Sequence, residues 1–423
     1  MKTLLITSIF LISQILTAQK VVSKTDLEEY NFFYSDTANN EFSFGDYEPK
    51  DIIVLNDGSY LIGTELSISF PSQYKTTENF DSIYFAKSKI FQEKSHISSG
   101  TVFKLNSSFE KEWETIFKGQ RIKKIFKTTD ERILIVGEDV SMKFVWLAEL
   151  NKNGDLLWKK HFEYKNKVTI ADALLDNNNE IYLILESSHI IPIQIRKYYG
   201  KRRIHFFKDS EIKSHLAILK VSTDGAKRWL KPIEKRKKYE KYGYNLVTSQ
   251  NSIFTSYTYS GFEKDSHIEG KKVVEISKSG KKILTTEIPG QEILLFDNGL
   301  VTITSSSKGK LILYKSGEQI DSTNIESADK DVRIEKVINK SNSFIILGSN
   351  YDNNMDYLLI NLSLNLKFSG YWTYPREEYN EIRGAVTLDN GDVVIIGKCY
   401  QKKPGTPNEL TTYINLIKIK NGI

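Results

Sequence analysis

Cysteine, proline, methionine and histidine are all scarce in this chain of 423 residues, which has one cysteine, eight prolines, three methionines and six histidines. A single cysteine excludes a disulfide-stapled fold, and the low proline content excludes a collagen-like or proline-rich chain. Because 40% of the residues are hydrophobic and 26% are charged, the composition is not that of a disordered protein. A chain of this length buries enough apolar surface to fold without staples.

Long apolar runs are missing everywhere except at the amino terminus. Lys2 is followed by a mostly apolar run from Leu4 to Leu16, and the small residue Ala18 precedes Gln19. This layout predicts a secretory signal peptide over residues 1–18, and the run is too short to cross a bilayer as a mature helix. We therefore expect an exported protein, periplasmic or extracellular, with one domain over residues 19–423 and no transmembrane segment.

Motifs for catalysis, phosphate binding and metal binding are also missing. The histidines are scattered without the short spacings that zinc sites need, and no nucleophile elbow, phosphate loop or calcium loop is found. The acidic run Asp352–Asp356 lacks the glycine and the final carboxylate of a calcium loop, which favours a polar blade loop. Cys399 lies at a predicted strand end and is interpreted as a packed or half-exposed thiol. We expect no cofactor and no metal, and we name no catalytic residue.

What the chain does contain is a repeat. The segments Leu105–Trp113, Leu150–Trp158 and Val221–Trp229 align without a gap, each running from an apolar residue to a tryptophan eight positions later. Weaker copies of this unit begin at Ile276, Leu313, Leu362 and Ile419. A fixed pattern of this kind indicates a repeat architecture.

Each copy is preceded by a second unit, in which two alternating apolar runs flank a turn. These units cover residues 53–63, 123–137, 171–185, 244–256, 293–303, 334–348 and 383–397. Turns such as Asn-Asp-Gly between β-branched runs predict hairpins. Two hairpins per repeat, seven times over, predict an all-β fold: a seven-bladed β-propeller of four-stranded blades. Six or eight blades, a pair of β-sandwiches and a parallel β-helix are the alternatives.

The seventh copy stops after its last turn, so its outermost strand is missing. The run Glu29–Tyr34 has no hairpin partner of its own. We predict that this N-terminal strand completes the last blade, which closes the ring and removes an open sheet edge.

The pattern Leu-Asn-x-x-Gly-x-x-x-Trp of Leu150–Trp158 resembles the repeats of the pyrroloquinoline-quinone-dehydrogenase-like propeller superfamily and of secreted Bacteroidota proteins that share it. The resemblance implies the fold and a tryptophan that packs between blades. It does not carry over the quinone cofactor, because the adjacent cysteine pair of those enzymes cannot exist here. Ser222–Trp229 also comes near the Asp box of sialidases, but Asp224 and Gly225 are adjacent, so we interpret it as a hairpin turn.

The formal net charge of +6 is unevenly distributed. Residues 196–241 hold 16 Lys and Arg against 5 Asp and Glu, and the remainder of the chain holds 43 against 48. In a propeller the links between second and third strands, and between blades, share one face. The register assigns the long insertions 66–98, 188–214, 232–243 and 399–411 to that face.

Long links gathered on one face favour a recognition surface. Cations interleaved with aromatics suit an anionic polymer, although a solvated charged loop is the alternative. The candidate binding residues are Arg196, Lys197, Tyr198, Tyr199, Lys201, Arg202, Arg203, Lys235, Arg236, Lys237, Lys238 and Tyr239.

We therefore expect a non-enzymatic binding or scaffold propeller that recognises an anionic polysaccharide or an acidic protein through one loop-rich basic face. We do not expect nucleic acid as the partner, because the protein is predicted to be exported. The alternatives are a propeller glycan hydrolase or lyase, whose carboxylates come from different blades and leave no local motif, and a structural subunit of an envelope assembly.

Overall fold

The computed structural model describes the backbone of residues 27–33, 44–69, 99–164, 167–199, 202–237, 240–263, 266–288, 292–296, 299–306, 310–315, 318–324, 332–340, 343–350, 356–363, 365–374, 380–403 and 406–420. These residues form strands and turns and contain no helix, so no helix among them is long and apolar enough to cross a membrane.

Seven sheets of four antiparallel strands make up the fold. Blades 1 to 3 consist of β2 (Phe44–Val54), β3 (Tyr60–Ser69), β4 (Ser99–Leu105) and β5 (Lys111–Lys118); β6 (Gln120–Lys127), β7 (Ile133–Asp139), β8 (Phe144–Leu150) and β9 (Leu156–Glu163); and β10 (Thr169–Leu175), β11 (Glu180–Tyr199), β12 (Arg202–Ser222) and β13 (Lys227–Lys237).

Blades 4 to 7 follow in chain order. They consist of β14 (Glu240–Thr248), β15 (Ser252–Glu263), β16 (Ser266–Ser277) and β17 (Lys282–Ile288); β18 (Glu292–Phe296), β19 (Gly299–Ser306), β20 (Lys310–Lys315) and β21 (Glu318–Asn324); β22 (Val332–Lys340), β23 (Ser343–Asn350), β24 (Asp356–Ser363) and β25 (Phe368–Tyr374); and β26 (Asn380–Thr387), β27 (Val393–Lys403), β28 (Thr406–Ile419) and β1 (Leu27–Phe33).

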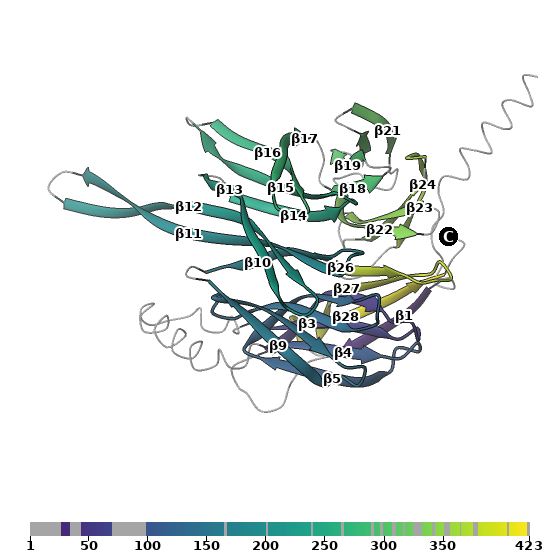
Figure 1. Cartoon of the computed structure of the whole chain (residues 1–423). Coiled ribbons are helices and arrows are strands. Elements are labelled where there is room, and N and C mark those ends of the chain that lie inside the picture. Colours follow the sequence, from purple (N-terminus) through teal and green to yellow (C-terminus); the bar gives the residue numbers. More distant parts are fainter. Residues whose placement is uncertain are drawn as a thin grey trace, which may run out of the picture.

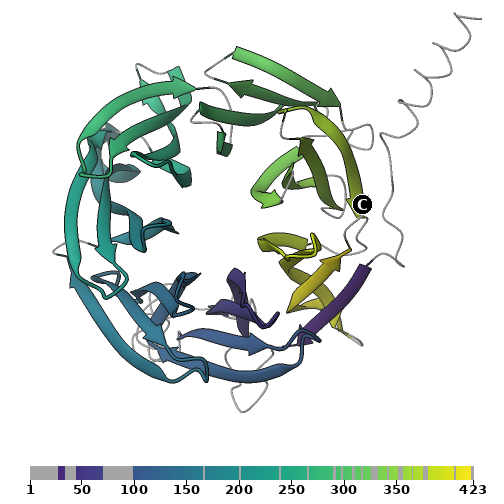
Figure 2. The same cartoon turned by 45° about the vertical axis from the view of Figure 1, so that its right-hand side comes forward.

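The blades stand in a ring around a central axis (Figure 2). The first strand of each blade is innermost, and successive first strands contact one another from β2 through β6, β10, β14, β18, β22 and β26 back to β2. The predicted seven-bladed β-propeller is therefore confirmed. Turns between first and second strands, and between third and fourth strands, lie at one end of the blades, and all other links lie at the opposite end.

The last blade is closed by a strand from the other end of the chain. β1 pairs antiparallel with β28 over its whole length, from Leu27 opposite Ile419 to Phe33 opposite Tyr413. This confirms the predicted N-terminal closing strand. Because β1 covers the outer edge of β28, the blade that contains the C-terminal residues has four strands like the rest.

Apolar side chains fill the spaces between neighbouring blades. Leu134, Val136 and Leu147 of blade 2 pack against Leu183 and Leu219 of blade 3, and all five are almost completely buried. Successive side chains along a strand point to opposite faces of the sheet. Every second residue of these strands therefore faces the same neighbouring blade. Blades 2 and 3 therefore each contribute to two interblade cores, one on either side.

Two of the three repeated tryptophans, Trp113 and Trp229, bond to the blade that follows their own. The indole Nε1 of Trp113 donates to the carbonyl of Lys152 at 3.1 Å, and a Cβ on Gly154 would lie 2.7 Å from the same ring. Trp229 repeats this geometry two interfaces further on, between blades 3 and 4, with the carbonyl of Lys278 at 3.3 Å. The glycines Gly154 and Gly280 are thus needed in their turns because the tryptophan of the preceding blade packs directly over each of them.

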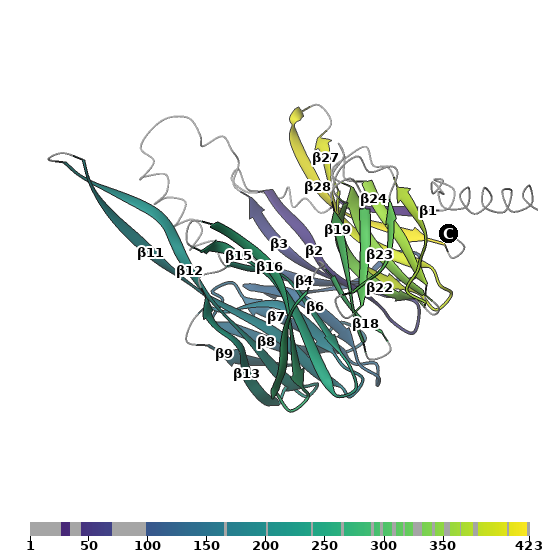
Figure 3. The same cartoon turned by 90° about the horizontal axis from the view of Figure 1, so that it is seen from above.

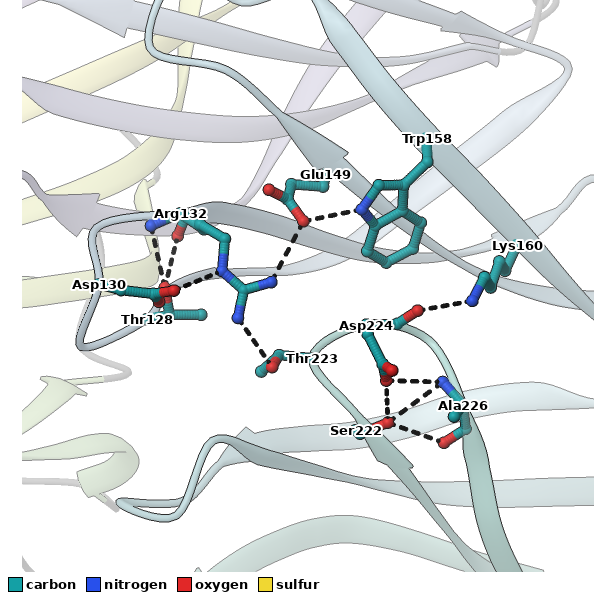
Figure 4. A network of polar contacts seen from close by, with 10 residues as sticks. All are labelled: Thr128, Asp130, Arg132, Glu149, Trp158, Lys160, Ser222, Thr223, Asp224 and Ala226. Atoms are coloured by element: carbon teal, nitrogen blue, oxygen red, sulfur yellow. Dashed lines mark hydrogen bonds and ion pairs between the residues drawn. The ribbon is translucent and has the colours of Figure 1, made fainter.

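Trp158 bonds to a different partner, a glutamate that also binds an arginine at the interface between blades 2 and 3 (Figure 4). Its Nε1 donates to Glu149 Oε2 at 2.8 Å, and the same oxygen accepts from Arg132 at 3.3 Å. Arg132 also donates to Thr223 Oγ1 at 2.9 Å. This network lies at the turn end of the blades and ties the β12–β13 turn to blade 2.

The sequence that resembles an Asp box is an ordinary turn, as predicted. Asp224 accepts from the amide of Ala226 at 3.1 Å and from the hydroxyl of Ser222, and Gly225 has a φ of 76°. Its carboxylate stabilises the turn itself (Figure 4).

Candidate functional site

The most prominent departure from the ring is a long ribbon made by β11 and β12 of blade 3 (Figures 1 and 3). The two strands stay paired from Glu180 opposite Ser222 to Tyr199 opposite Arg202. Their inner neighbour β10 pairs with β11 only as far as Glu186, and their outer neighbour β13 pairs with β12 only as far as Ser214. Beyond these points the two strands continue for roughly 35 Å without another described strand beside them. We call residues 188–199 and 202–213 the ribbon.

The expected loop insertion at 188–214 is therefore almost entirely strand. Ile190, Ile191, Ile193 and Ile195 on β11, with Phe206 opposite Ile195 on β12, are the β-branched and aromatic residues that strands favour. Sequence analysis interpreted this segment as an inserted loop because of its many basic residues, and so it did not recognise the strand pattern. A paired ribbon fixes the spacing of those residues along two strands, which an irregular loop does not.

The predicted binding residues fall into two separate groups. Arg196, Lys197, Tyr198 and Tyr199 end β11, and Arg202 and Arg203 begin β12 directly opposite them. Lys235, Arg236 and Lys237 end β13 at the ribbon's root, where Lys237 pairs with Ser214. Lys201, Lys238 and Tyr239 lie outside the described residues.

The structure does not bring these two groups together. Eleven positions of β12 separate Arg203 from Ser214, a span of roughly 35 Å along an extended strand. A single small ligand cannot contact both groups, whereas an extended chain can. The sequence alone placed them in two neighbouring loops and gave no measure of this separation.

The other long links fall at the same end of the blades. Residues 399–403 end β27 and residues 406–411 begin β28, with Cys399 opposite Tyr413. Residues 232–237 end β13, and residues 240–243 begin β14. Of residues 66–98, only 66–69 in β3 are described. The assignment of the links 188–214, 232–243 and 399–411 to one end of the molecule is therefore confirmed by the strand order.

A second polar region surrounds the axis and arises from β-bulges. Six inner strands carry one extra residue at the same place, opposite the second strand of their blade. In blades 1, 2 and 3 the residue after the bulge is Asp51, Lys124 and Asp172. A bulge re-aims side chains and is common next to functional sites.

These three residues form a line of alternating charge. Lys124 Nζ lies 3.9 Å from Asp51 Oδ1 and 3.9 Å from Asp172 Oδ1. The charge of Asp51 raises the pKa of Lys124, and burial raises the pKa of Asp172 although Lys124 opposes that shift. Asp51 also accepts from the amide of Ile125 at 3.0 Å, so this carboxylate links blade 1 to blade 2.

More ion pairs lie on the ribbon side of this line. Glu65 pairs with Lys50 at 3.2 Å and with Arg121 at 2.9 Å, and Glu48 pairs with Lys50 at 3.0 Å and with Arg383 at 3.1 Å. Burial raises the pKa of Glu48, but Lys50 and Arg383 outweigh this and hold it below its usual range. These ion pairs join blades 1, 2 and 7.

Glu335 differs from these acids. It is the extra residue of the same bulge in blade 6, accepts from Ser349 at 3.0 Å and lies 3.2 Å from Arg333. Burial nevertheless raises its pKa. Chemically, the axial region offers ion pairs across blades and two carboxyl groups, Asp172 and Glu335, that hold a proton more readily than usual. Sequence analysis missed all of these residues because the contacts that link them across blades join residues that are far apart in the chain.

An apolar cavity of about 260 Å³ lies between blades 2 and 3 at the ribbon's root. It is lined by Tyr164, Val168, Leu185, Ser187, His215, Ala217 and Leu230. None of these residues belongs to a recognisable motif, and they come from four segments, namely the link between β9 and β10, β11, β12 and β13.

No metal-binding cluster is found in the part of the chain that the structure describes. Of the acidic run Asp352–Asp356, residues 352–355 lie outside that part.

No protein-family model matches the chain. No curated protein matches it. Solved structures do resemble it. The Dos1 propeller is 8% identical and has a TM-score of 0.49, with 97% of each chain covered. A protein of unknown function from Dyadobacter fermentans DSM 18053 is 10% identical with a TM-score of 0.47, covering 93% of this chain and 100% of that one. The polysaccharide lyase Uly1 is 9% identical with a TM-score of 0.49, covering 93% and 99%. These likenesses concern the fold alone.

Proposed function

We propose that this protein is an exported binding propeller that recognises an anionic macromolecule through the β11–β12 ribbon. The observation that carries the proposal is the ribbon itself, because closing a blade does not require it. In blade 2 the equivalent link runs only from Asp139 to Phe144. A two-stranded extension gains little stability of its own, which favours a role outside folding.

The charge of the ribbon supports an anionic partner. Residues 196–213 contain seven Lys and Arg against one Asp and one Glu. Positive charges spaced along two paired strands attract a polyanion, and the attraction weakens as salt screens it. The aromatic residues Tyr198, Tyr199 and Phe206 add contacts that tolerate different partners.

The proposal also states that the protein is exported and that it belongs to a superfamily of repeat propellers. A signal peptide over residues 1–18, followed by one domain over residues 19–423, fits a periplasmic or extracellular protein. The contact of Trp113 and Trp229 with the next blade fits the packing role of tryptophan in the pyrroloquinoline-quinone-dehydrogenase-like repeats. Cleavage between Ala18 and Gln19, read by mass spectrometry of the mature protein, tests the export step.

Binding to immobilised dextran sulfate and to poly-glutamate tests the function. The variant R202S/R203S removes two cations from the ribbon tip. The control K152S/K281S removes two exposed cations from turns at the opposite end of the blades, so both variants lose the same charge. We expect the ribbon variant to bind at least about fivefold more weakly at low salt and with a shallower salt dependence, and the control to bind like wild type. Equal, salt-insensitive binding by all three proteins contradicts the proposal.

A glycan hydrolase or lyase is the second candidate, and the raised pKa values of Asp172 and Glu335 favour it. Such an enzyme releases reducing or unsaturated ends from acidic polysaccharides. Product release by wild type that D172N and E335Q abolish, with folding unchanged, supports it; no release from the same polysaccharides removes it.

A structural subunit of an envelope assembly is the third candidate. Leu156 and Leu157 on β9, and Ile283 and Leu284 on β17, are about half exposed on outer strands. Exposed apolar residues on a rim suit a permanent protein contact. Analytical sedimentation of wild type and of L157S/L284S tests this. If the protein assembles through the rim, the variant is expected to sediment as a smaller species than wild type.

A further inference from the structure

Lys159 of β9 lies at the interface between blades 1 and 2 in surroundings that are unusual for a lysine. Its Nζ lies 4.7 Å from the centre of the Trp146 ring and 5.7 Å from the centre of the Phe117 ring. The same Nζ donates to the side-chain carbonyl of Gln120. In the part of the chain that the structure describes, no carboxylate forms an ion pair with it. The half-buried amine therefore has rings and a neutral amide around it, and no counter-charge.

The carboxylate of Asp139 is close to this region but is held by its own turn. Asp139 is opposite Gln120 in the β6–β7 pair. It accepts from the amide of Lys143 at 2.9 Å and from the amide of Phe144 at 2.7 Å. These bonds keep the carboxylate in the turn between β7 and β8, where it does not neutralise Lys159.

Burial without a counter-charge disfavours the ammonium form of Lys159. Burial lowers its pKa to about 8, and the attraction of the two rings for a cation opposes this shift. At pH 7.4 an amine with this pKa is neutral in about 20% of molecules, compared with about 0.1% for an ordinary lysine. Only the neutral amine has the lone pair that attacks a carbonyl carbon, and desolvated lysines form imines in this way. Lys159 is therefore a nucleophile that the proposed function does not use.

His161 lies beside Lys159, two positions further along the same face of β9. It is exposed, and Trp146 is directly opposite it on β8. Burial and the charge of Lys159 lower the pKa of His161, although Asp139 opposes this, so the imidazole is neutral at pH 7.4 and can accept a proton. Its ring meets the half-buried ring of Phe144 with 6.0 Å between the centroids. An accessible base and an aromatic surface thus lie next to the amine.

The adjacent Lys160 offers a comparison within one strand. Its Nζ also lies over an indole, 5.6 Å from the centre of the Trp158 ring, but it faces blade 3. There it donates to the carbonyl of Asp224 at 2.6 Å, and the residue is exposed. Because the two lysines differ chiefly in burial, Lys160 is a matched reference for the reactivity of Lys159.

We propose that Lys159 is a covalent binding site for aromatic aldehydes. The Nζ adds to the aldehyde carbon, and one proton of the amine moves to the aldehyde oxygen. The second proton of the amine then leaves with that oxygen as water, so that a C=N bond links the protein to the ligand. His161 carries these protons, and the ring of the aldehyde packs against Phe144.

The reaction needs no other reactant, and water reverses it. Because no ion pair holds the Lys159 side chain among the described residues, its flexible stem can bring the Nζ to a carbonyl at the surface. The site lies between blades 1 and 2, whereas the ribbon belongs to blade 3. The inference therefore does not depend on the proposed function.

Benzaldehyde and propanal test the site with the full mature protein at pH 7.4. Sodium borohydride added at short intervals reduces each imine to a stable amine, and tandem mass spectrometry of the chymotryptic peptide that contains both lysines locates the adducts. We expect Lys159 to react with benzaldehyde at least about tenfold faster than Lys160, and to show a smaller advantage with propanal. Equal rates at the two lysines overturn the site, and equal advantages with the two aldehydes overturn the aromatic class.

The variant Q120E places a carboxylate beside the Lys159 amine, where its charge favours the ammonium form. We expect the rate at Lys159 to fall at least about fivefold at pH 7.4. The control Q319E adds the same charge at an exposed position of β21 in blade 5 and is expected to react like wild type. Melting temperatures confirm that both variants fold. An unchanged rate in Q120E contradicts a neutral amine as the nucleophile.

The pH profile of wild type decides the matter without any variant. We expect the initial rate at Lys159 to rise with pH and to reach half of its maximum near pH 8. The variant H161N keeps this midpoint but is expected to react at least about threefold more slowly, because a proton carrier is lost. A midpoint near pH 10 in wild type overturns the proposal, and an unchanged rate in H161N contradicts the role of the histidine.

Discussion

β11 and β12 pass through two very different environments. Inside blade 3 they are flanked by β10 and β13, and Ile184 and Leu219 are completely buried. Beyond Glu186 and Ser214 the same two strands continue without described neighbours, and the sequence becomes rich in Lys and Arg. The pairing between the two strands is common to both parts. What differs is whether other strands and blades cover them.

This difference separates stability from recognition within one hairpin. Burial against neighbouring blades makes the inner part a component of the interblade core, where lost volume is costly. The ribbon has no such packing partners among the described strands, so its residues are free to vary in charge and shape without unfolding the blade. Predictions that compare the two parts follow, from the largest effect to the smallest.

Truncating a leucine in the inner part tests the comparison most strongly. L219A removes a fully buried side chain from the core between blades 2 and 3, and we expect the free energy of unfolding to fall by about 3 kcal/mol. The matched variant I195A in the ribbon is expected to change it by less than about 0.5 kcal/mol. Urea denaturation measures both. Similar losses at the two positions show that the ribbon is part of the folded core.

Turns that pack against a neighbouring blade and turns that do not are also expected to differ in how much a substitution destabilises the protein. Gly154 and Gly119 both have positive φ, 87° and 68°, but a Cβ on Gly154 would lie 2.7 Å from Trp113 and a Cβ on Gly119 would meet nothing within 4 Å. We expect G154A to cost about 2 kcal/mol and G119A about 1 kcal/mol, because only the first adds a steric clash to the backbone strain. Equal melting temperatures for the two variants contradict the packing role of the tryptophan.

A charged lysine that is partly buried in the packed region is expected to destabilise the folded protein, whereas a charged lysine on the ribbon is not. Burial lowers the pKa of Lys159 to about 8, although its Nζ lies 4.7 Å from the centre of the Trp146 ring. The unfolded chain keeps this proton up to about pH 10.4. Stability therefore rises with pH between about 8 and 10.4, and the full cost of the buried charge is present below pH 8.

The variant K159M removes that charge. After allowance for solvent screening, we expect it to be about 1 kcal/mol more stable than wild type at pH 7, with an advantage that disappears above about pH 10. K197M on the ribbon is the control and is expected to match wild type throughout. Denaturation at several pH values measures this, and a difference for K159M that does not vary with pH contradicts it.

The fold was predictable because its determinants are local and repeated. Leu150–Trp158 and its copies mark the outer hairpin, and turns such as Asp389–Gly391 shape the inner one, so seven copies predict seven blades. The closing strand was predictable from a different fact, namely that the last copy lacks a strand and the run Glu29–Tyr34, which overlaps β1, lacks a hairpin partner of its own. Each of these inferences needs only neighbouring residues and the geometry of a hairpin.

The candidate sites were less accessible to sequence analysis. Lys124 meets Asp51 and Asp172 only because three blades converge at the axis, and Tyr164 meets Ala217 only because two blades pack together. No local pattern marks such encounters. The basic block was correctly located at one end of the molecule, but its division into a tip and a root depends on pairing over many residues, which composition does not reveal.

The pairing of β1 with β28 also sets the order in which this molecule is completed. Leu27 and Ile419 are neighbours in space although 392 positions (419 − 27) separate them in the sequence. Contacts between such distant residues form slowly, because a very long loop must close first. Six blades can assemble while the chain is still being made, but the ring is sealed only after its last strand is available. Until β1 and β28 pair, each of them presents a bare edge, and this interval is when the chain is most exposed to pairing with another copy.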